Sequence, residues 1–180
     1  MSAGGGRARE CLVLGVEAAG KSLLLRRLWE IASSKPSELL NDATSPTVGQ
    51  DVIAVRGRND SPISVREIGG RMGSAWMSYT DLCSSVILMT DIADPGALSA
   101  SAVLVQELLA QLCADEKRIL LVLNKRDLTD DFHLRVAMNL LRLKDLPLLY
   151  PEVKLDCLTG SLYDIQFVLA IYSWIVTWNE

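Results

Sequence analysis

The chain has 180 residues, of which 49% are hydrophobic and 22% are charged, so it can bury one substantial core, and its length favours a single domain. Its formal net charge of −4 and isoelectric point near 5.1 exclude the basic surface that neutralises a nucleic-acid backbone, and we expect no nucleic-acid partner. With one histidine and no CxxC pair among its four cysteines, the chain lacks a ligand cluster for zinc.

The chain begins with MSAGGGRARE, which contains no apolar run, and we predict a flexible tail over residues 1–9. Ser2 stands where N-myristoylation requires a glycine directly after the initiator methionine. A short apolar strand at 10–14 is followed by a glycine loop and then by a helix from Lys21, because leucines recur there at helical spacing. Residues 33–46 are polar and contain prolines, so we predict a long loop of the kind that often carries function.

Two extended segments follow, DVIAVR at 51–56 and SPISVREI at 61–68. They are joined by GRND, whose residue types are typical of a hairpin turn. We therefore expect the two strands to pair antiparallel.

The rest of the chain alternates helices and strands. Helices are predicted at 72–80, 97–114, 130–142 and 167–178, and strands at 84–90, 118–125 and 153–157. RILLVLNK, at 118–125, is too continuously apolar to have a solvated face, which indicates a mainly parallel sheet covered by helices. The prediction is an α/β fold in which a mainly parallel six-stranded sheet carries one antiparallel edge hairpin and has helices on both faces.

Two features concern burial. The cysteines fall within or beside apolar runs, so Cys11, Cys83, Cys113 and Cys157 are expected to be reduced and buried. The most apolar run, FVLAIYSWIVTW at 167–178, is shorter than the roughly 18–20 residues of a membrane span. We predict a terminal core helix there, with a partner-facing apolar stripe as the alternative.

The first chemical motif is GVEAAGKS, Gly15–Ser22, which matches GxxxxGK[ST]. In such a loop the main-chain N–H groups cradle phosphates, Lys21 reaches the β and γ oxygens, and the Ser22 hydroxyl ligates Mg²⁺. An ordinary glycine turn is the alternative interpretation. The position of the motif between a buried strand and a helix favours phosphate binding.

The second motif is NKRD, Asn124–Asp127, directly after an apolar strand. A carboxylate there can accept hydrogen bonds from N1–H and the 2-amino group of guanine, whereas adenine would leave it unpaired. Lys125 can lay its stem over the purine, and Asn124 can tie this loop to the phosphate loop. A surface turn is the alternative, but parallel topology brings both motifs to one edge of the sheet.

With these motifs the chain resembles the small GTPases of the Arf-like family. SPTVGQ (45–50) is similar to the family's first switch, REIGGRMGSAWMSY (66–79) to its second, and DCLTG (156–160) to its final guanine loop. The resemblance implies a P-loop small GTPase fold in which residues 10–180 form one GTP-binding domain. The residues that it assigns to GTP or GDP are Gly15, Glu17, Ala18, Ala19, Gly20, Lys21, Ser22, Leu23, Thr47, Gly70, Asn124, Lys125, Asp127, Cys157, Leu158 and Thr159.

The resemblance also assigns a metal site and a catalytic region. Ser22 and Thr47 should ligate Mg²⁺, Glu67 should act on it through water, and Gly70 should donate its N–H to the γ-phosphate. The family usually has aspartate where this chain has Glu67 and glutamine where it has Arg71. Because a guanidinium only donates hydrogen bonds, Arg71 cannot orient an attacking water as glutamine does. Three fates remain open for Arg71: a solvated or salt-bridged side chain, an effector contact, or a stabilising charge in hydrolysis.

The function implied is a GTP-gated switch with very weak intrinsic hydrolysis, whose residues 42–80 bind effectors. An exchange factor and an activating protein are the other expected partners. Family analogy suggests a cytoplasmic monomer in membrane or ciliary trafficking, peripheral at the Golgi or cilium, with membrane contact indirect if it occurs. A constitutively GTP-bound scaffold is the alternative; a kinase is disfavoured because no arginine-rich lid is evident.

Three apolar residues near the switches have two interpretations. Trp76, Ile53 and Val55 can form a partner-binding patch, or they can belong to the core.

Overall fold

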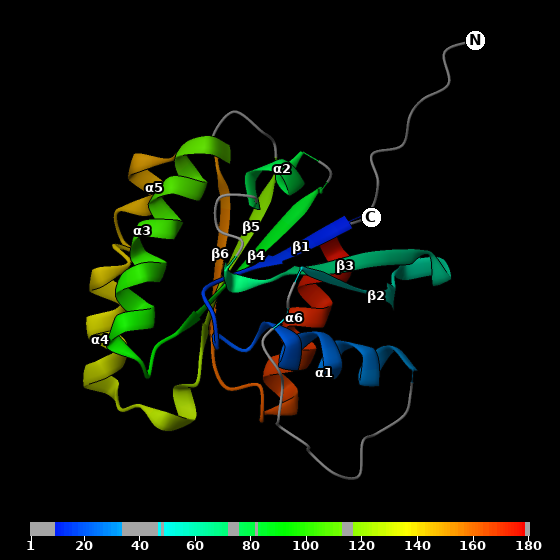
Figure 1. The fold of residues 1–180 in the computed structure, drawn as a ribbon, viewed down its shortest axis with the longest axis horizontal. Coiled ribbons are helices and arrows are strands. Elements are labelled where there is room, and N and C mark those ends of the chain that lie inside the picture. The colour runs from blue at the N-terminus through cyan, green and yellow to red at the C-terminus, as the bar shows by residue number, and fades with distance from the viewer. Residues whose placement is uncertain are drawn as a thin grey trace.

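A computed structural model describes residues 10–33, 47, 49–71, 76–81, 83–112 and 117–178 (Figure 1). Its strands are β1 (Glu10–Leu14), β2 (Gln50–Arg56), β3 (Pro62–Ile68), β4 (Ser85–Asp91), β5 (Arg118–Asn124) and β6 (Lys154–Thr159). Its helices are α1 (Lys21–Ser33), α2 (Trp76–Thr80), α3 (Pro95–Leu112), α4 (Asp131–Leu140), α5 (Leu146–Leu149) and α6 (Ile165–Trp178). Cys113, most of the predicted 33–46 loop and the first half of the predicted 72–80 helix lie outside the described residues.

The strands form one six-stranded sheet in the order β2-β3-β1-β4-β5-β6. All neighbouring strands are parallel except β2 and β3, which pair antiparallel from Gln50↔Ile68 to Arg56↔Pro62. Every residue of β1 and β4 is buried, as expected for central parallel strands with both faces covered. The predicted mainly parallel sheet with an antiparallel edge hairpin is confirmed.

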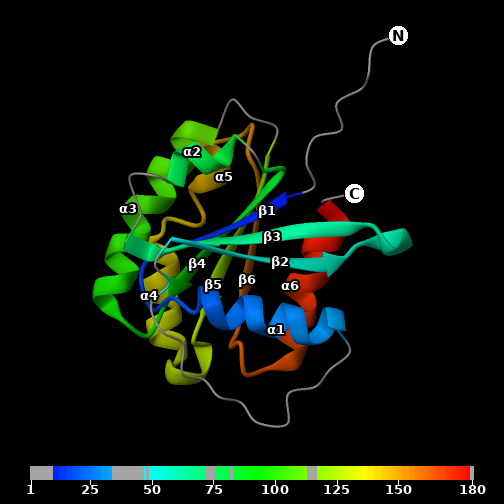
Figure 2. The same cartoon turned by 45° about the vertical axis from the view of Figure 1, so that its right-hand side comes forward.

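Helices cover both faces of the sheet (Figure 2). Helices α1 and α6 lie on one face, where Leu24, Leu28 and Ile171 pack against alternate strand residues such as Val13. Helices α2, α3, α4 and α5 lie on the other face, packed against the opposite set of strand residues. This division follows from the pleat, which points successive side chains to opposite sides.

The terminal segment is a core helix. Phe167, Val168, Ile171 and Ile175 of α6 are buried in the cluster that α6 shares with α1 and the sheet. Within the described residues, no helix combines the length and apolarity needed to cross a membrane. The core-helix interpretation of this apolar run is therefore confirmed.

The burial predicted for the cysteines is correct in part. Cys11 and Cys83 are buried, whereas Cys157 is exposed. Cys157 lies on β6, the edge strand paired only with β5, and this edge position is the reason that the prediction was wrong.

Two helical elements differ from the sequence prediction. Helix α3 begins at Pro95, earlier than predicted, because Asp94 Oδ1 accepts hydrogen bonds from the N–H groups of Gly96 (2.7 Å) and Ala97 (3.0 Å). These bonds lower the pKa of the Asp94 carboxyl. Pro95 suits the first position of the helix, because a proline has no N–H that would need a partner there. The single-turn helix α5 was not predicted, because one turn is too short to show a period.

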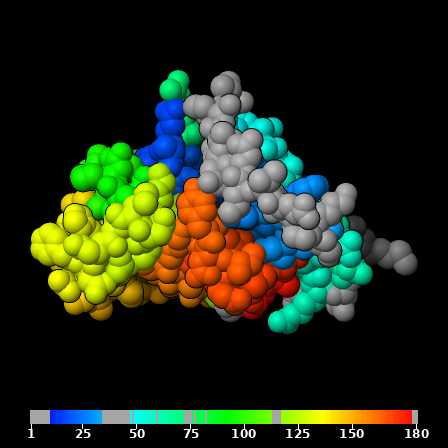
Figure 3. Space-filling view, turned by 90° about the horizontal axis from the view of Figure 1, so that it is seen from below, coloured from blue at the N-terminus to red at the C-terminus, as the bar shows by residue number. Residues whose placement is uncertain are grey.

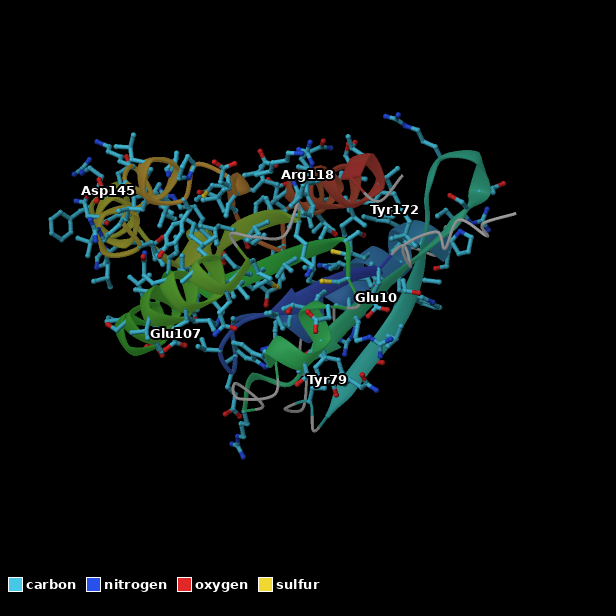
Figure 4. All side chains as sticks on the ribbon, turned by 90° about the horizontal axis from the view of Figure 1, so that it is seen from above. Glu10, Tyr79, Glu107, Arg118, Asp145 and Tyr172 are labelled. Atoms are coloured by element: carbon cyan, nitrogen blue, oxygen red, sulfur yellow. The ribbon has the colours of Figure 1, made fainter. Side chains whose placement is uncertain are left out.

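The two ends of the sheet differ in what they can bind. Glu10 and Arg118 are the first residues of β1 and β5, and Figure 4 views the sheet from the end where these strands begin. The loops that follow β1 and β5 lie at the opposite end. In parallel α/β sheets ligands bind at the carboxyl ends of the strands, so the site is expected at that opposite end.

Candidate nucleotide site

The phosphate loop follows β1 and leads into α1. Gly15 has φ 144° and Gly20 has φ 101°, conformations that favour glycine. A Cβ on Gly15 would lie 2.4 Å from the main-chain oxygen of Met89, and a Cβ on Gly20 would lie 2.5 Å from Nδ2 of Asn124. Both glycines are therefore required by backbone geometry and by close packing.

Lys21 is fixed at the start of α1. Its side chain is 5% exposed, and its Nζ donates to the carbonyl oxygens of Gly15 (2.8 Å) and Val16 (2.9 Å). Burial lowers the pKa of Lys21, while the charges of Glu67 and Glu17 oppose that shift. The ammonium is thus held beneath the loop, where an anionic ligand would compensate its desolvation.

Three oxygen atoms meet beside the phosphate loop. Ser22 Oγ lies 3.0 Å from Thr47 Oγ1, and both hydroxyls lie close to Glu67 Oε1, at 2.9 and 3.0 Å. Among the described residues, no group of three His, Cys, Asp or Glu side chains can hold a metal. The all-oxygen set instead fits a hard cation such as Mg²⁺.

A cavity of about 180 Å³ opens beside the phosphate loop. It is lined by Gly20, Leu23, Asn124, Lys125, Asp127, Leu128, Ser161, Leu162 and Tyr163. The segment around residue 126 lies side by side with the segment around residue 160 in the view from below (Figure 3), and the Arg126 N–H donates to the Gly160 carbonyl at 3.1 Å. The two motifs predicted from the sequence therefore share one pocket.

Asn124 connects three parts of the pocket. Its side chain is 3% exposed, and its Nδ2 donates to the carbonyl of Ala19 in the phosphate loop at 2.9 Å. Its Oδ1 accepts from the N–H of Leu162 at 3.3 Å. The first of these bonds is the tie between the two loops that the sequence predicts.

Lys125 precedes a single 3-10 turn formed by residues 126–128, and Asp127 lies within that turn. Lys125 has φ 66°, and its Nζ donates to Oδ2 of the buried Asp91 at 2.6 Å. This ion pair holds the lysine stem along the pocket wall, a role for Asp91 that sequence analysis did not find. Asp127 lies at the exposed rim of the cavity, with its carboxylate able to meet a base that enters.

Residues 161–163 form the last wall of this cavity. Cys157, Leu158 and Thr159 are strand residues of β6, paired with β5, and they do not line the cavity. Ser161, Leu162 and Tyr163 line it instead. The chain turns away from strand β6 at Gly160, where a Cβ would lie 2.4 Å from the Phe167 ring. A glycine after a strand indicates a turn, so the position of this turn is visible in the sequence.

The double glycine after β3 packs between the two other loops. A Cβ on Gly69 would lie 2.4 Å from the Thr47 carbonyl oxygen, and a Cβ on Gly70 would lie 2.5 Å from the main-chain nitrogen of Glu17. The Gly69 N–H donates to the Gly49 carbonyl at 2.9 Å. The double glycine is therefore in contact both with the phosphate loop and with the segment that resembles the first switch.

Arg71 is salt-bridged to the phosphate loop. Its Nε and Nη2 donate to the two carboxylate oxygens of Glu17, at 2.9 and 3.1 Å. The hydrogen bonds to Arg71 lower the pKa of Glu17, and the same bonds raise the pKa of Arg71. Of the three roles left open for Arg71, the salt bridge is the one observed among the described residues.

The apolar residues near the switches belong mainly to the core. Trp76 is 3% exposed and its Nε1 donates to the Gly69 carbonyl at 3.1 Å, while Val55 is 1% exposed. Ile53 is partly buried against the same core. For Trp76 and Val55 the partner-patch interpretation is therefore wrong, because both side chains are buried in the core.

Comparison with known proteins agrees with this geometry. The sequence profile of the ADP-ribosylation factor family matches residues 2–170. The chain is 37% identical over 148 residues to human ADP-ribosylation factor-like protein 16, an alignment that covers 79% of this chain and 73% of the relative. A phosphate loop, an adjoining base pocket and these matches together show that the chain belongs to the ADP-ribosylation factor family of guanine-nucleotide-binding switch proteins.

Proposed function

We propose that this protein is a GTP-gated switch that hydrolyses GTP very slowly and binds effectors through residues 42–80. The observation that carries the proposal is the contact of Gly69 and Gly70 with both Thr47 and the phosphate loop. A ligand that adds a third phosphate there would bias both segments at once. A role in membrane or ciliary trafficking, with cytoplasmic and peripheral location, is proposed on family grounds alone.

The residues at the site fit a nucleotide with Mg²⁺. Lys21 and the phosphate-loop N–H groups would bind the phosphates, and Asp127 would select guanine. Ser22, Thr47 and Glu67 would hold Mg²⁺, whose charge supplies electrostatic stabilisation of the phosphate oxygens. The residues at 161–163 would close the base pocket, next to Cys157, Leu158 and Thr159, whose segment the family resemblance assigns to the guanine.

The proposed slow hydrolysis follows from the chemistry at position 71. Arg71 has hydrogen-bond donors and no acceptor, and two of its donors are already directed at Glu17. A water molecule beside a γ-phosphate would therefore find no carbonyl oxygen from this side chain to orient it.

We expect protein loaded with GTP and Mg²⁺ to release little inorganic phosphate over hours. Arg71→Gln should leave the rate unchanged or raise it, because it restores a side chain with an oxygen acceptor and frees Glu17. Single-turnover phosphate release measures both proteins, with Arg142→Gln as a control at an exposed arginine far from the site. A wild-type rate near 1 per second without any partner, or a further loss in Arg71→Gln, would contradict the proposal.

A constitutively GTP-bound scaffold is the second candidate, favoured by the same Arg71–Glu17 pair. A switch requires that GDP and GTP stabilise different shapes, since a ligand with equal affinity for two states shifts nothing. Hydrogen–deuterium exchange of the 49–71 segment distinguishes the candidates. We expect slower exchange there in the GTP form than in the GDP form, with β4 and β5 as internal controls. Equal exchange in both forms would favour the scaffold.

A further inference from the structure

Glu67 occupies an unusual environment for a carboxylate. It lies near the end of β3, its side chain is 2% exposed, and its Oε2 is buried without a hydrogen-bond partner among the described residues. Its Oε1 accepts from the Ser22 and Thr47 hydroxyls. Burying an ionised carboxylate with one oxygen unsatisfied costs free energy unless a positive charge compensates it.

The position of Glu67 is set by the sheet. Its Cα pairs with Val13 on β1 and with Asp51 on β2, so neighbours on both sides fix the register. The strand pleat directs its side chain to the face covered by α1, where Ser22 begins the helix with Lys21. Lys21 supplies one positive charge nearby, but its Nζ is directed at the carbonyl oxygens of Gly15 and Val16. A cation placed between the three oxygens would suit this arrangement.

The three oxygens have the spacing of ligands around one small ion. Mg²⁺ binds oxygens at about 2.0–2.1 Å in octahedral geometry, which puts adjacent ligand oxygens about 2.8–3.0 Å apart. The three edges of the Ser22, Thr47 and Glu67 triangle are 3.0, 2.9 and 3.0 Å. All three edges therefore match one face of the octahedron.

We propose that Glu67 binds Mg²⁺ directly through Oε1, in place of the water through which the shorter aspartate of the family is expected to act. The inference rests on the proposed Mg²⁺–nucleotide binding and concerns only how this side chain reaches the metal. The extra methylene of glutamate moves the carboxylate oxygen to within hydrogen-bond distance of both hydroxyls, as the measured triangle shows. An aspartate on the same fixed strand position would fall short and leave room for water.

The consequence is a metal with one fewer coordinated water and one more anionic ligand. With three protein oxygens and two phosphate oxygens bound, an octahedral ion has a single position left for water. In Glu67→Asp a second water should enter. Hydroxyl groups that only donate hydrogen bonds to a carboxylate have similar oxygen–oxygen distances. The distances therefore do not distinguish direct ligation of Mg²⁺ from hydrogen bonding alone, and the number of coordinated waters is the measurement that does.

The test uses Mn²⁺ as the probe, with the full chain and guanylyl imidodiphosphate. Broadening of the Mn²⁺ electron paramagnetic resonance lines in ¹⁷O-enriched water counts the coordinated waters. We expect one fewer water in the wild-type protein than in Glu67→Asp. A single coordinated water in the wild type supports the inference, and two waters in the wild type would overturn it. Because the wild-type count alone decides, the test survives a variant that does not fold.

The second measurement is the affinity of the nucleotide-loaded protein for Mg²⁺. Glu67→Asp and the isosteric, uncharged Glu67→Gln should each weaken Mg²⁺ binding to the nucleotide-loaded protein by at least about 10-fold, because the loss of even a partner outside the coordination shell costs about 10–100-fold. Glu107→Gln, at an exposed position on α3, is the matched control and should leave it unchanged. Unchanged affinity in both Glu67 variants would also overturn direct ligation. If wild-type protein binds no Mn²⁺ or nucleotide at all, the proposed function fails instead, and the two failures are thus distinguishable.

Discussion

Lys21→Asn and Ser22→Asn should each abolish tight retention of guanine nucleotide and lower the melting temperature by about 10 °C. Lys21 is the buried cation at the phosphate loop, and its loss would remove the charge proposed to bind the phosphates. Ser22 carries one of the three oxygens of the proposed metal site, and asparagine is too large for the space between Thr47 and Glu67.

The loss of stability has a thermodynamic cause beyond the lost contacts. A ligand present at about 1,000 times its Kd adds about 4 kcal/mol to the free energy of unfolding, and a protein that cannot bind loses that contribution. Chromatography of nucleotide released from purified protein measures retention, and differential scanning calorimetry measures the melting temperature.

Lys144→Asn is the matched control, because this lysine is exposed and lies in the turn after α4. It should retain nucleotide and melt as the wild type does. Nucleotide retention at the wild-type level in either Lys21→Asn or Ser22→Asn would show that the phosphate loop does not bind as proposed.

GTP should displace a fluorescent guanine nucleotide at least about 10³-fold more effectively than ATP. The expected reason is Asp127, whose carboxylate lies at the rim of the cavity beside Lys125. Guanine offers it two N–H donors, whereas adenine offers neither in that geometry and leaves the acid without partners.

Asp127→Ala should weaken GTP binding by about 10²–10⁴-fold, since hydrogen bonds to a charged group contribute about 1.5–3 kcal/mol each. ATP binding should change little in this variant, so the preference for GTP should largely disappear. Asp145→Ala is the control, because Asp145 lies between helices α4 and α5 (Figure 4) and pairs with Arg142. Competition by ATP as effective as by GTP in the wild type would refute the assignment of the base pocket.

Parts of this protein are determined by local sequence. The residues of the phosphate loop, among them Gly15, Gly20 and Lys21, lie within one short stretch of sequence. Such a stretch between a buried strand and a helix is sufficient to predict the loop. The parallel sheet follows from continuous apolar runs, and the hairpin follows from alternation around turn residues. These features depend on neighbours in the chain, which is why they could be predicted.

Other parts were decided by tertiary structure. The Arg71–Glu17 pair and the Glu67, Ser22 and Thr47 triangle join residues far apart in the sequence. The approach of such groups depends on strand register, on the pleat and on side-chain direction, and none of these is visible in a local pattern.

The end of the base pocket shows the same limit. The sequence resemblance assigned residues 156–160 to the final guanine loop, and in the structure β6 runs through Thr159 by pairing with β5. Gly160, packed against Phe167, then turns the chain so that residues 161–163 line the cavity. The sequence by itself determined that a nucleotide-binding α/β domain would form. Only the packed structure decided which side chains line the cavity, because that choice depends on long-range contacts.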